Sequence, residues 1–245
     1  LKKADVAMYQ AKSAGRNTAR FFDPVMQAAA ATHAAMAQEI KVGIERKEFV
    51  LHYQVQIDAR GHCTGAEALV RWNHRVRGLV SPAHFIPLAE ETGMILPLGY
   101  WVLDSACQQL AAWSRNPATA HWTLAVNVSA AQLAQPGFVE SVKKALLHSQ
   151  APATQLKLEL TESMLANDVE GIITKMMDIK ALGVNFSLDD FGTGYSSLSY
   201  LKRLPLSQLK IDKSFVRDVL TDPSDAVIAR TVVALGHSLG LTVIA

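Results

Sequence analysis

The sequence predicts an α/β domain whose strands form a barrel of the TIM type, with the last unit of the barrel missing from this chain. Seven short apolar runs of strand length recur along the 245 residues, and helical patterns with a single apolar stripe lie between most of them. Strands that alternate with helices are typical of parallel pairing through helical crossovers. An eight-stranded barrel is one arrangement of such units, and an open doubly wound sheet is the alternative. No glycine-rich phosphate loop follows the first strand, which argues against the open sheet.

The strands are predicted from alternating and from continuous apolar runs. Residues 51–58 alternate apolar and polar side chains, which is typical of a half-buried strand. Residues 65–72 form a second strand after a turn that contains glycine, and we expect these two strands to pair as a hairpin. Further strands are predicted at residues 124–128, 156–160, 184–188, 209–211 and 241–245.

Helices are predicted where apolar residues recur at intervals of three or four positions. Four such stripes lie between the strands, over residues 98–113, 138–146, 169–176 and 228–239. Each stripe is expected to face the sheet, because a surface helix buries its apolar side.

The first 47 residues have a different pattern. Residues 1–15 form a short helical pattern that Gly15 would cap, and residues 18–22 could be a short strand. Asp23 and Pro24 then begin an alanine-rich helix that runs to about Lys47. This helix either connects two folded units or is the first helix of the main domain. Because the chain begins with leucine and stops within an apolar run, we expect both ends to be cut from a longer protein.

Composition excludes several classes of function. A formal net charge of +2 provides no electrostatic footprint for a nucleic acid polymer or for an anionic membrane. Two cysteines are too few for a disulfide scaffold or a four-thiolate zinc site, so a reducing compartment is expected. The sequence shows neither a charged start followed by an apolar stretch nor an apolar run of about 18 residues, the length that spans a bilayer. A cytoplasmic location without direct membrane contact is therefore expected for this part of a protein whose upstream segments could still carry an anchor.

Reactive groups gather at the carboxyl ends of the strands in a parallel barrel, and polar side chains stand inside or just after the predicted strands of this chain. Each of five successive strands carries at least one: Glu67, Asn127, Glu159, the pair Asp189 and Asp190, and Lys210. Any single one has an ordinary explanation, such as an N-cap, a buried ion pair or an exposed strand edge. Acids that converge from separate strands would repel one another, and one lysine cannot neutralise all of them, whereas a hard divalent cation can.

The types of donor indicate which metal would bind. Carboxylates and one amide carbonyl offer only oxygen, which suits Mg²⁺ or Mn²⁺ better than zinc. None of the eight histidines lies at a metal-ligand spacing. The set is large enough for two cations, and two cations a few ångströms apart are typical of phosphodiester displacement.

Three further features of the sequence each have a functional and a structural explanation. Arg71 shares a strand face with Glu67 and could pair with a phosphate, or form an ion pair at the barrel rim. Gln54 belongs to the polar face of the first strand, which is by itself typical of a solvated face. Residues 191–197 contain two glycines and two serines, so they form either a mobile loop coupled to the aspartate pair or an ordinary strand-to-helix turn.

From about residue 38 to its end, the chain resembles the EAL domain of bacterial cyclic di-GMP phosphodiesterases. The matching motifs stand in the family's order: Tyr53-Gln54, Glu67-Ala68-Leu69 with Arg71-Trp72, Phe85-Ile86-Pro87-Leu88-Ala89-Glu90, Asn127-Val128-Ser129, Glu159-Leu160-Thr161-Glu162, Asp189-Asp190-Phe191-Gly192-Thr193-Gly194 and Lys210-Ile211-Asp212. Residues 1–22 are similar to the last helix and strand of a GGDEF (diguanylate cyclase) domain. The resemblance thus implies a GGDEF remnant over 1–22, a connecting helix over 23–47, and an EAL domain over 48–245.

The resemblance implies a modified TIM barrel whose first strand runs antiparallel, a homodimer, and hydrolysis of cyclic di-GMP to linear pGpG. It also implies the roles of individual residues. Glu67, Asn127, Glu159 and Asp189 would bind one Mg²⁺ or Mn²⁺, and Asp189 would share a second ion with Asp190. Lys210 would hold the attacking water. The catalytic residues implied by the resemblance are Glu67, Lys210 and Asp190. Gln54 and Arg71 would contact the substrate, and Glu162 would anchor the loop after Asp190.

The chain departs from the family pattern in two places. Val55 stands where the family usually has proline, and the sequence stops at Ala245, before the glutamate that completes the second metal site in the family. The resemblance therefore implies an active parent protein and leaves open whether this part is active alone. Two other functions stay open: a degenerate domain that binds cyclic di-GMP without cleaving it, and an inert scaffold that transmits signals between attached domains.

Overall fold

The computed structural model describes residue 8 and residues 24–166, 168–192 and 198–245 of the chain. Apart from residue 8, the predicted GGDEF remnant at residues 1–22 lies outside these ranges. The described chain forms two compact units. Of the described residues, 24–50 and 71–95 belong to one unit, and those within 51–70 and 96–245 belong to the other. The domain boundaries predicted at residues 22 and 47 stay predictions.

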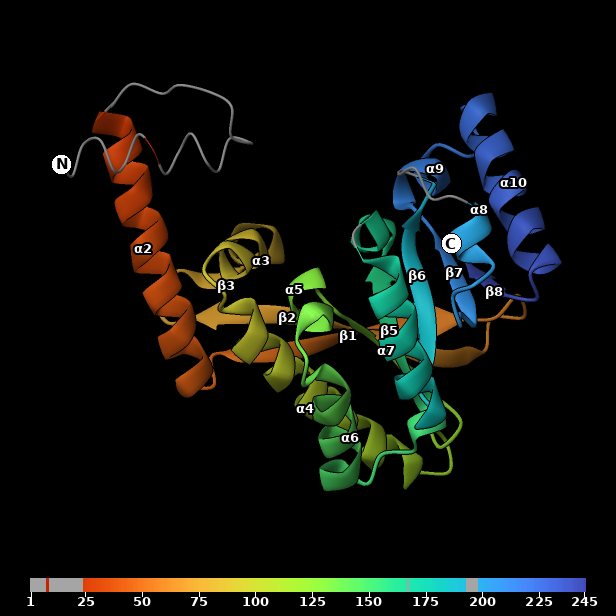
Figure 1. Ribbon diagram of the computed structural model, residues 1–245, viewed down its shortest axis with the longest axis horizontal. Helices are drawn as coiled ribbons and strands as arrows, with labels where there is room; N and C mark the ends of the chain where they lie inside the picture. Colours follow the sequence, from red (N-terminus) through yellow and green to blue (C-terminus); the bar gives the residue numbers. More distant parts are fainter. Residues whose placement is uncertain (1–7, 9–23, 167, 193–197) are drawn as a thin grey trace. The chain divides into compact units, whose positions relative to one another are not determined.

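One sheet of eight strands runs through the molecule in the order β1-β2-β4-β5-β6-β7-β8, with the short β3 paired to β2 (Figure 1). The strands are β1 (Phe49–Ile57), β2 (Cys63–His74), β3 (Gly78–Val80), β4 (Thr123–Asn127), β5 (Leu156–Thr161), β6 (Asn185–Phe191), β7 (Gln208–Ile211) and β8 (Thr242–Ile244). From β2 to β8 through β4, every neighbouring pair is parallel. β1 and β2 form the predicted hairpin. At its turn, the backbone N–H of Asp58 donates to the carbonyl of His62 (2.9 Å), and the Thr64 hydroxyl donates to the carbonyl of Gln56 (3.3 Å).

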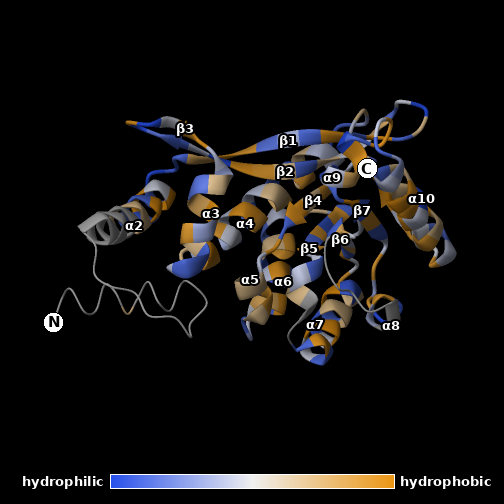
Figure 2. Ribbon diagram, turned by 90° about the horizontal axis from the view of Figure 1, so that it is seen from above, coloured by the Kyte–Doolittle hydropathy of each residue, from blue (hydrophilic) through white to orange (hydrophobic). Residues whose placement is uncertain are grey.

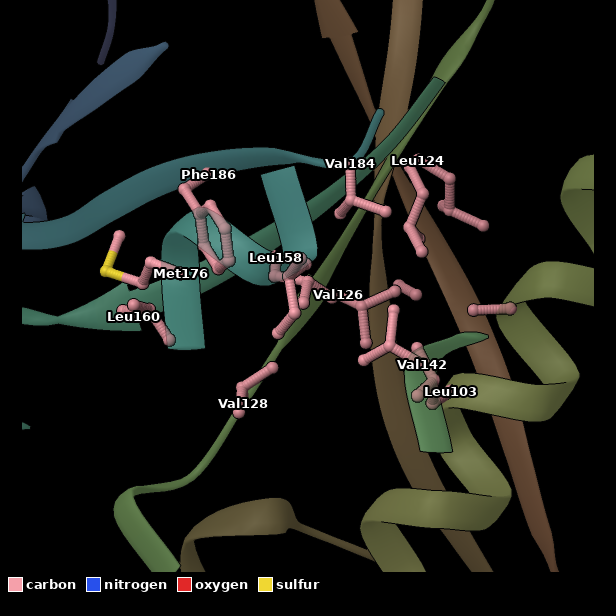
Figure 3. Packing of buried hydrophobic residues seen from close by; sticks show 14 of the residues in the cluster. Leu103, Leu124, Val126, Val128, Val142, Leu158, Leu160, Met176, Val184 and Phe186 are labelled. Carbon is pink, nitrogen blue, oxygen red and sulfur yellow. The ribbon is translucent and has the colours of Figure 1, made fainter. Parts of the chain in front are cut away.

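The unit of residues 51–70 and 96–245 has a core between the sheet and its crossover helices. These helices are α4 (Ile95–Ser114), α6 (Phe138–Ser149), α7 (Val169–Ala181) and α10 (Pro223–Ser238), which cover the four predicted stripes. Figure 3 shows Val126, Leu158 and Phe186 of three adjacent strands packed with Val142 and Met176 of the helices. β4 is coloured mainly hydrophobic in Figure 2, which agrees with a strand buried on both faces.

Shorter elements connect these layers. They are the α-helices α5 (Ala130–Ala134), α8 (Leu198–Leu201) and α9 (Lys213–Arg217) and the 3-10 helices η1 (Ala153–Gln155) and η2 (Glu162–Ala166). α5 begins with a complete capping box, in which the Ser129 hydroxyl accepts from the Gln132 backbone and the Gln132 side chain accepts from the Ser129 backbone. Among the described residues, no helix combines the length and the apolar character needed to cross a membrane.

The other unit contains α2 (Pro24–Glu45), α3 (Pro82–Glu91) and β3, and it has an aromatic core of its own. Phe49 stacks on Trp72 with ring centroids 5.1 Å apart, and Phe85 meets both rings edge-on. The end of α2 packs here, since Ile40 is fully buried and a Cβ at Gly43 would lie 3.0 Å from the Trp72 indole nitrogen. The sequence pattern does not indicate β3 or α3, because three residues are too few for a periodic signal and Pro87 interrupts the helical pattern.

Candidate metal centre

The residues of the candidate site come from five parallel strands whose register brings them to one rim. Glu67 lies on β2, Asn127 is the last residue of β4, and Glu159 lies beside Asn127 on β5. Asp189 lies near the end of β6 and Lys210 near the end of β7. Because the carboxyl ends of parallel strands share one edge of a barrel, side chains that are far apart in the sequence meet there.

The ammonium of Lys210 lies among three carboxylates. Its Nζ donates to Glu67 Oε2 at 2.7 Å, to Glu159 Oε2 at 3.1 Å and to Asp189 Oδ2 at 3.1 Å. Asn127 joins the cluster from the other side, because its Nδ2 donates to Glu67 Oε1 at 2.7 Å. The structure thus brings together the four predicted ligands of the first metal ion and the predicted catalytic lysine.

Burial and mutual repulsion perturb the acids of this cluster. Burial raises the pKa of Glu159 to about 7, the charges of Glu67 and Asp189 add to this effect, and Lys210 opposes it. Burial alone would lower the pKa of Lys210, but the charges of Glu159, Glu67 and Asp189 outweigh it and raise that pKa, so the ammonium stays protonated near neutral pH.

The donor set fits a hard divalent cation. One oxygen from each of Glu67, Glu159 and Asp189 lies within 4.8 Å of the others. Glu159 Oε1 is buried without a hydrogen-bond partner in the described structure, which is costly for a carboxylate oxygen unless a ligand satisfies it. Three carboxylates and an amide carbonyl are the ligands that Mg²⁺ and Mn²⁺ prefer.

Asp190 lies next to this cluster, but its carboxyl group is directed elsewhere. The β6–β7 register shifts between Leu188 and Phe191, as in a β-bulge, and Asp190 has a left-handed backbone with φ of 53°. Its side chain hydrogen-bonds that of Asp212, and burial, the charge of Asp189 and this bond raise the pKa of Asp190 to about 6. Asp212 was not assigned a role in the predicted site, although it stands two residues after Lys210 in the Lys210-Ile211-Asp212 motif.

The loop after Asp190 is tied to Glu162. Gly192 donates its backbone N–H to Glu162 Oε2 at 3.2 Å, and Glu162 is buried at the start of η2. This is the contact that a loop anchor requires, and the anchoring role itself stays a prediction. Residues 193–197 lie outside the described chain.

The two predicted substrate contacts are placed differently. Gln54 on β1 lines a cavity of about 240 Å³ together with Glu67 and Lys210. Val243 and Ile244 of β8 form an apolar wall of this cavity, which sequence reasoning did not assign to the site. Arg71 lies on β2 four residues beyond Glu67, in the other compact unit, and its role toward the cluster stays a prediction.

Comparisons with known proteins agree with this geometry. A sequence model of the EAL domain matches residues 37–245. The chain is 46% identical over 243 residues to the bifunctional diguanylate cyclase/cyclic di-GMP phosphodiesterase MucR of Pseudomonas aeruginosa, covering 99% of the chain and 35% of that protein. It is 38% identical over 245 residues to the cyclic di-GMP phosphodiesterase PdeR of Escherichia coli, covering 100% of the chain and 37% of that protein. The chain thus spans about a third of the length of the curated relatives that it matches.

Solved structures confirm the fold. The PaMucR phosphodiesterase in complex with c-di-GMP matches with a TM-score of 0.82 and 45% identity, over 85% of each chain. The EAL enzyme Bd1971 in its cGMP-bound form matches with a TM-score of 0.82 and 31% identity, over 89% of this chain and 60% of that one. The predicted barrel with an antiparallel first strand is confirmed, and in this chain it is open and incomplete.

Proposed function

The chain belongs to the EAL domain family, and we propose that it hydrolyses cyclic di-GMP to linear pGpG with the help of two divalent metal ions. The observation that carries this proposal is the group of three carboxylates around Lys210, joined by Asn127, at the carboxyl rim of the barrel. Two relatives named as cyclic di-GMP phosphodiesterases, MucR and PdeR, align over almost the whole chain.

We assign one Mg²⁺ or Mn²⁺ to Glu67, Asn127, Glu159 and Asp189, whose oxygens fit it as described above. A second ion would take Asp189 and Asp190, which requires the Asp190 carboxyl to release its bond to Asp212. Bound ions of this kind stabilise the charge that develops on the phosphoryl oxygens and activate a water as nucleophile.

The side chains of the chain position the reactants. Lys210 keeps its proton at neutral pH, so its Nζ donates hydrogen bonds and orients the oxygen of the attacking water without serving as a base. Gln54 lies at the cavity beside Lys210, where it can contact a guanine base, and Arg71 is assigned to a phosphate. Glu162 holds Gly192 and so limits the movement of the segment that follows Asp190.

The product, linear pGpG, determines which bonds form and which break in the reaction. The water oxygen forms a bond to phosphorus, the bond from phosphorus to the 3′-oxygen breaks, and the departing oxygen ends with a proton. Linear pGpG retains the second phosphodiester, so one turnover consumes one water. A homodimer and a cytoplasmic location remain predictions from the family resemblance.

The test is the conversion of cyclic di-GMP to pGpG by the purified protein in the presence of Mn²⁺, followed by chromatography. The expected result is metal-dependent formation of pGpG that a chelator abolishes. Binding of cyclic di-GMP without turnover would select a receptor domain instead, and the absence of binding would select a scaffold.

A further inference from the structure

The ammonium of Lys210 occupies the position from which one cation reaches all three acidic ligands. Its Nζ lies 2.7 to 3.1 Å from one oxygen of Glu67, Glu159 and Asp189. The side chains of Glu67, Glu159 and Asp189 are largely shielded from solvent, with exposures of 11%, 0% and 16%. Water therefore screens the interactions of their charges only weakly. A single positive charge therefore faces three acids at this site.

The same oxygens are the ones that a divalent cation needs. Glu159 uses only Oε2 toward Lys210, and its Oε1 stays without a partner. Lysine is suited to a reversible role, because its charge sits on a flexible four-carbon stem. Lys210 also borders the cavity of about 240 Å³ that Gln54 lines, which offers space into which the ammonium can move.

From this geometry we infer that Lys210 is the internal counter-ion of Glu67, Glu159 and Asp189, and that a divalent cation binds by displacing its ammonium from at least one of these carboxylates. This inference rests on the proposed metal site. It adds that Lys210 opposes metal binding and stabilises the metal-free protein, besides any role in turnover. The charge of Lys210 then allows the wild-type protein to fold before it binds metal. The same charge lowers the affinity for the metal.

The test compares the wild-type protein with Lys210→Met in two measurements that need no substrate. Thermal unfolding in a chelator reports on the metal-free state, and calorimetric titration with Mn²⁺ reports on affinity. Lys210→Met is expected to lower the chelator unfolding temperature by about 5–15 °C, because three buried acids lose their cation. It is expected to tighten Mn²⁺ binding by about tenfold, because the competing charge is gone. Lys143→Met is the matched control, since that exposed lysine lies 4.0 Å from Glu140 on α6 and should change neither value.

A double variant keeps the test decisive if Lys210→Met does not fold in the chelator. Glu67→Gln in the Lys210→Met background removes one of the uncompensated charges, so it should raise the unfolding temperature above that of the single variant. A Lys210→Met protein as stable as wild type in the chelator, or one that binds Mn²⁺ no more tightly, overturns the inference. So does a double variant less stable than the single one. A wild-type protein that binds no Mn²⁺ would instead overturn the proposed function, which separates the two failures.

Discussion

Replacement of Glu67 by alanine tests the proposed site most directly. The Glu67 carboxylate accepts from Lys210 Nζ and from Asn127 Nδ2, each at 2.7 Å, and Glu67 is only 9% exposed. Its removal takes the charge-assisted hydrogen bond from Lys210, which costs about 1.5–3 kcal/mol, whereas Asn127 is exposed and can bond to water instead. Relief of the repulsion from Glu159 and Asp189 offsets part of this cost, so the variant is expected to remain folded within a total stability of about 5–15 kcal/mol.

Activity should respond far more strongly than stability to Glu67→Ala. Loss of one metal ligand and of the charge that fixes Lys210 is expected to lower the rate of pGpG formation by at least about 10³-fold. The assay is the initial rate at saturating Mg²⁺, with urea unfolding measured on the same samples. Glu140→Ala serves as the control, because Glu140 is an exposed acid on α6. Wild-type rates for a folded Glu67→Ala protein at saturating Mg²⁺ would refute the ligand assignment.

Two other substitutions and the reactivity of one cysteine provide further predictions. Glu162→Gln weakens the acceptor for the Gly192 N–H, so turnover should fall by about tenfold while the unfolding temperature moves little; an unchanged rate would contradict the anchoring role. Gly65→Val should prevent stable folding, because even a Cβ at Gly65 would lie 2.2 Å from the Thr123 carbonyl oxygen; a variant with the urea midpoint of wild type would refute this packing argument. Burial raises the pKa of Cys107 to about 12 from its ordinary 9, so the native thiol should resist a thiol reagent at pH 8 until denaturant is added, whereas the partly exposed Cys63 reacts first. The sign of this shift means that the stability contributed by Cys107 is present below pH 9 and is lost as the pH rises toward 12, which a pH series of unfolding midpoints would show.

The arrangement of strands could be predicted because its signals are local. The alternation over residues 51–58 follows from the period of two of a strand, and the continuous apolar run over residues 124–128 is typical of a strand buried on both faces. Each signal lies within a short window of the sequence. β1 and β4 occupy these places, and the helical stripes became α4, α6, α7 and α10 for the same reason. The aromatic cluster of Phe49, Trp72 and Phe85 could not be predicted, because it joins segments that only the fold brings together.

The amino-acid order alone singled out the residues of the cluster, since Glu67, Asn127, Glu159, Asp189 and Lys210 are polar residues within the apolar runs or directly after them. Tertiary structure decided which of these side chains form ion pairs and hydrogen bonds with one another. Lys210 meets Glu67 across 143 residues of chain, and the irregular β6–β7 pairing leaves the carboxyl of Asp190 bonded to Asp212 although Asp189 beside it faces Lys210. Strand register and backbone twist set these contacts, and both depend on packing across the whole sheet, which no local window of sequence contains.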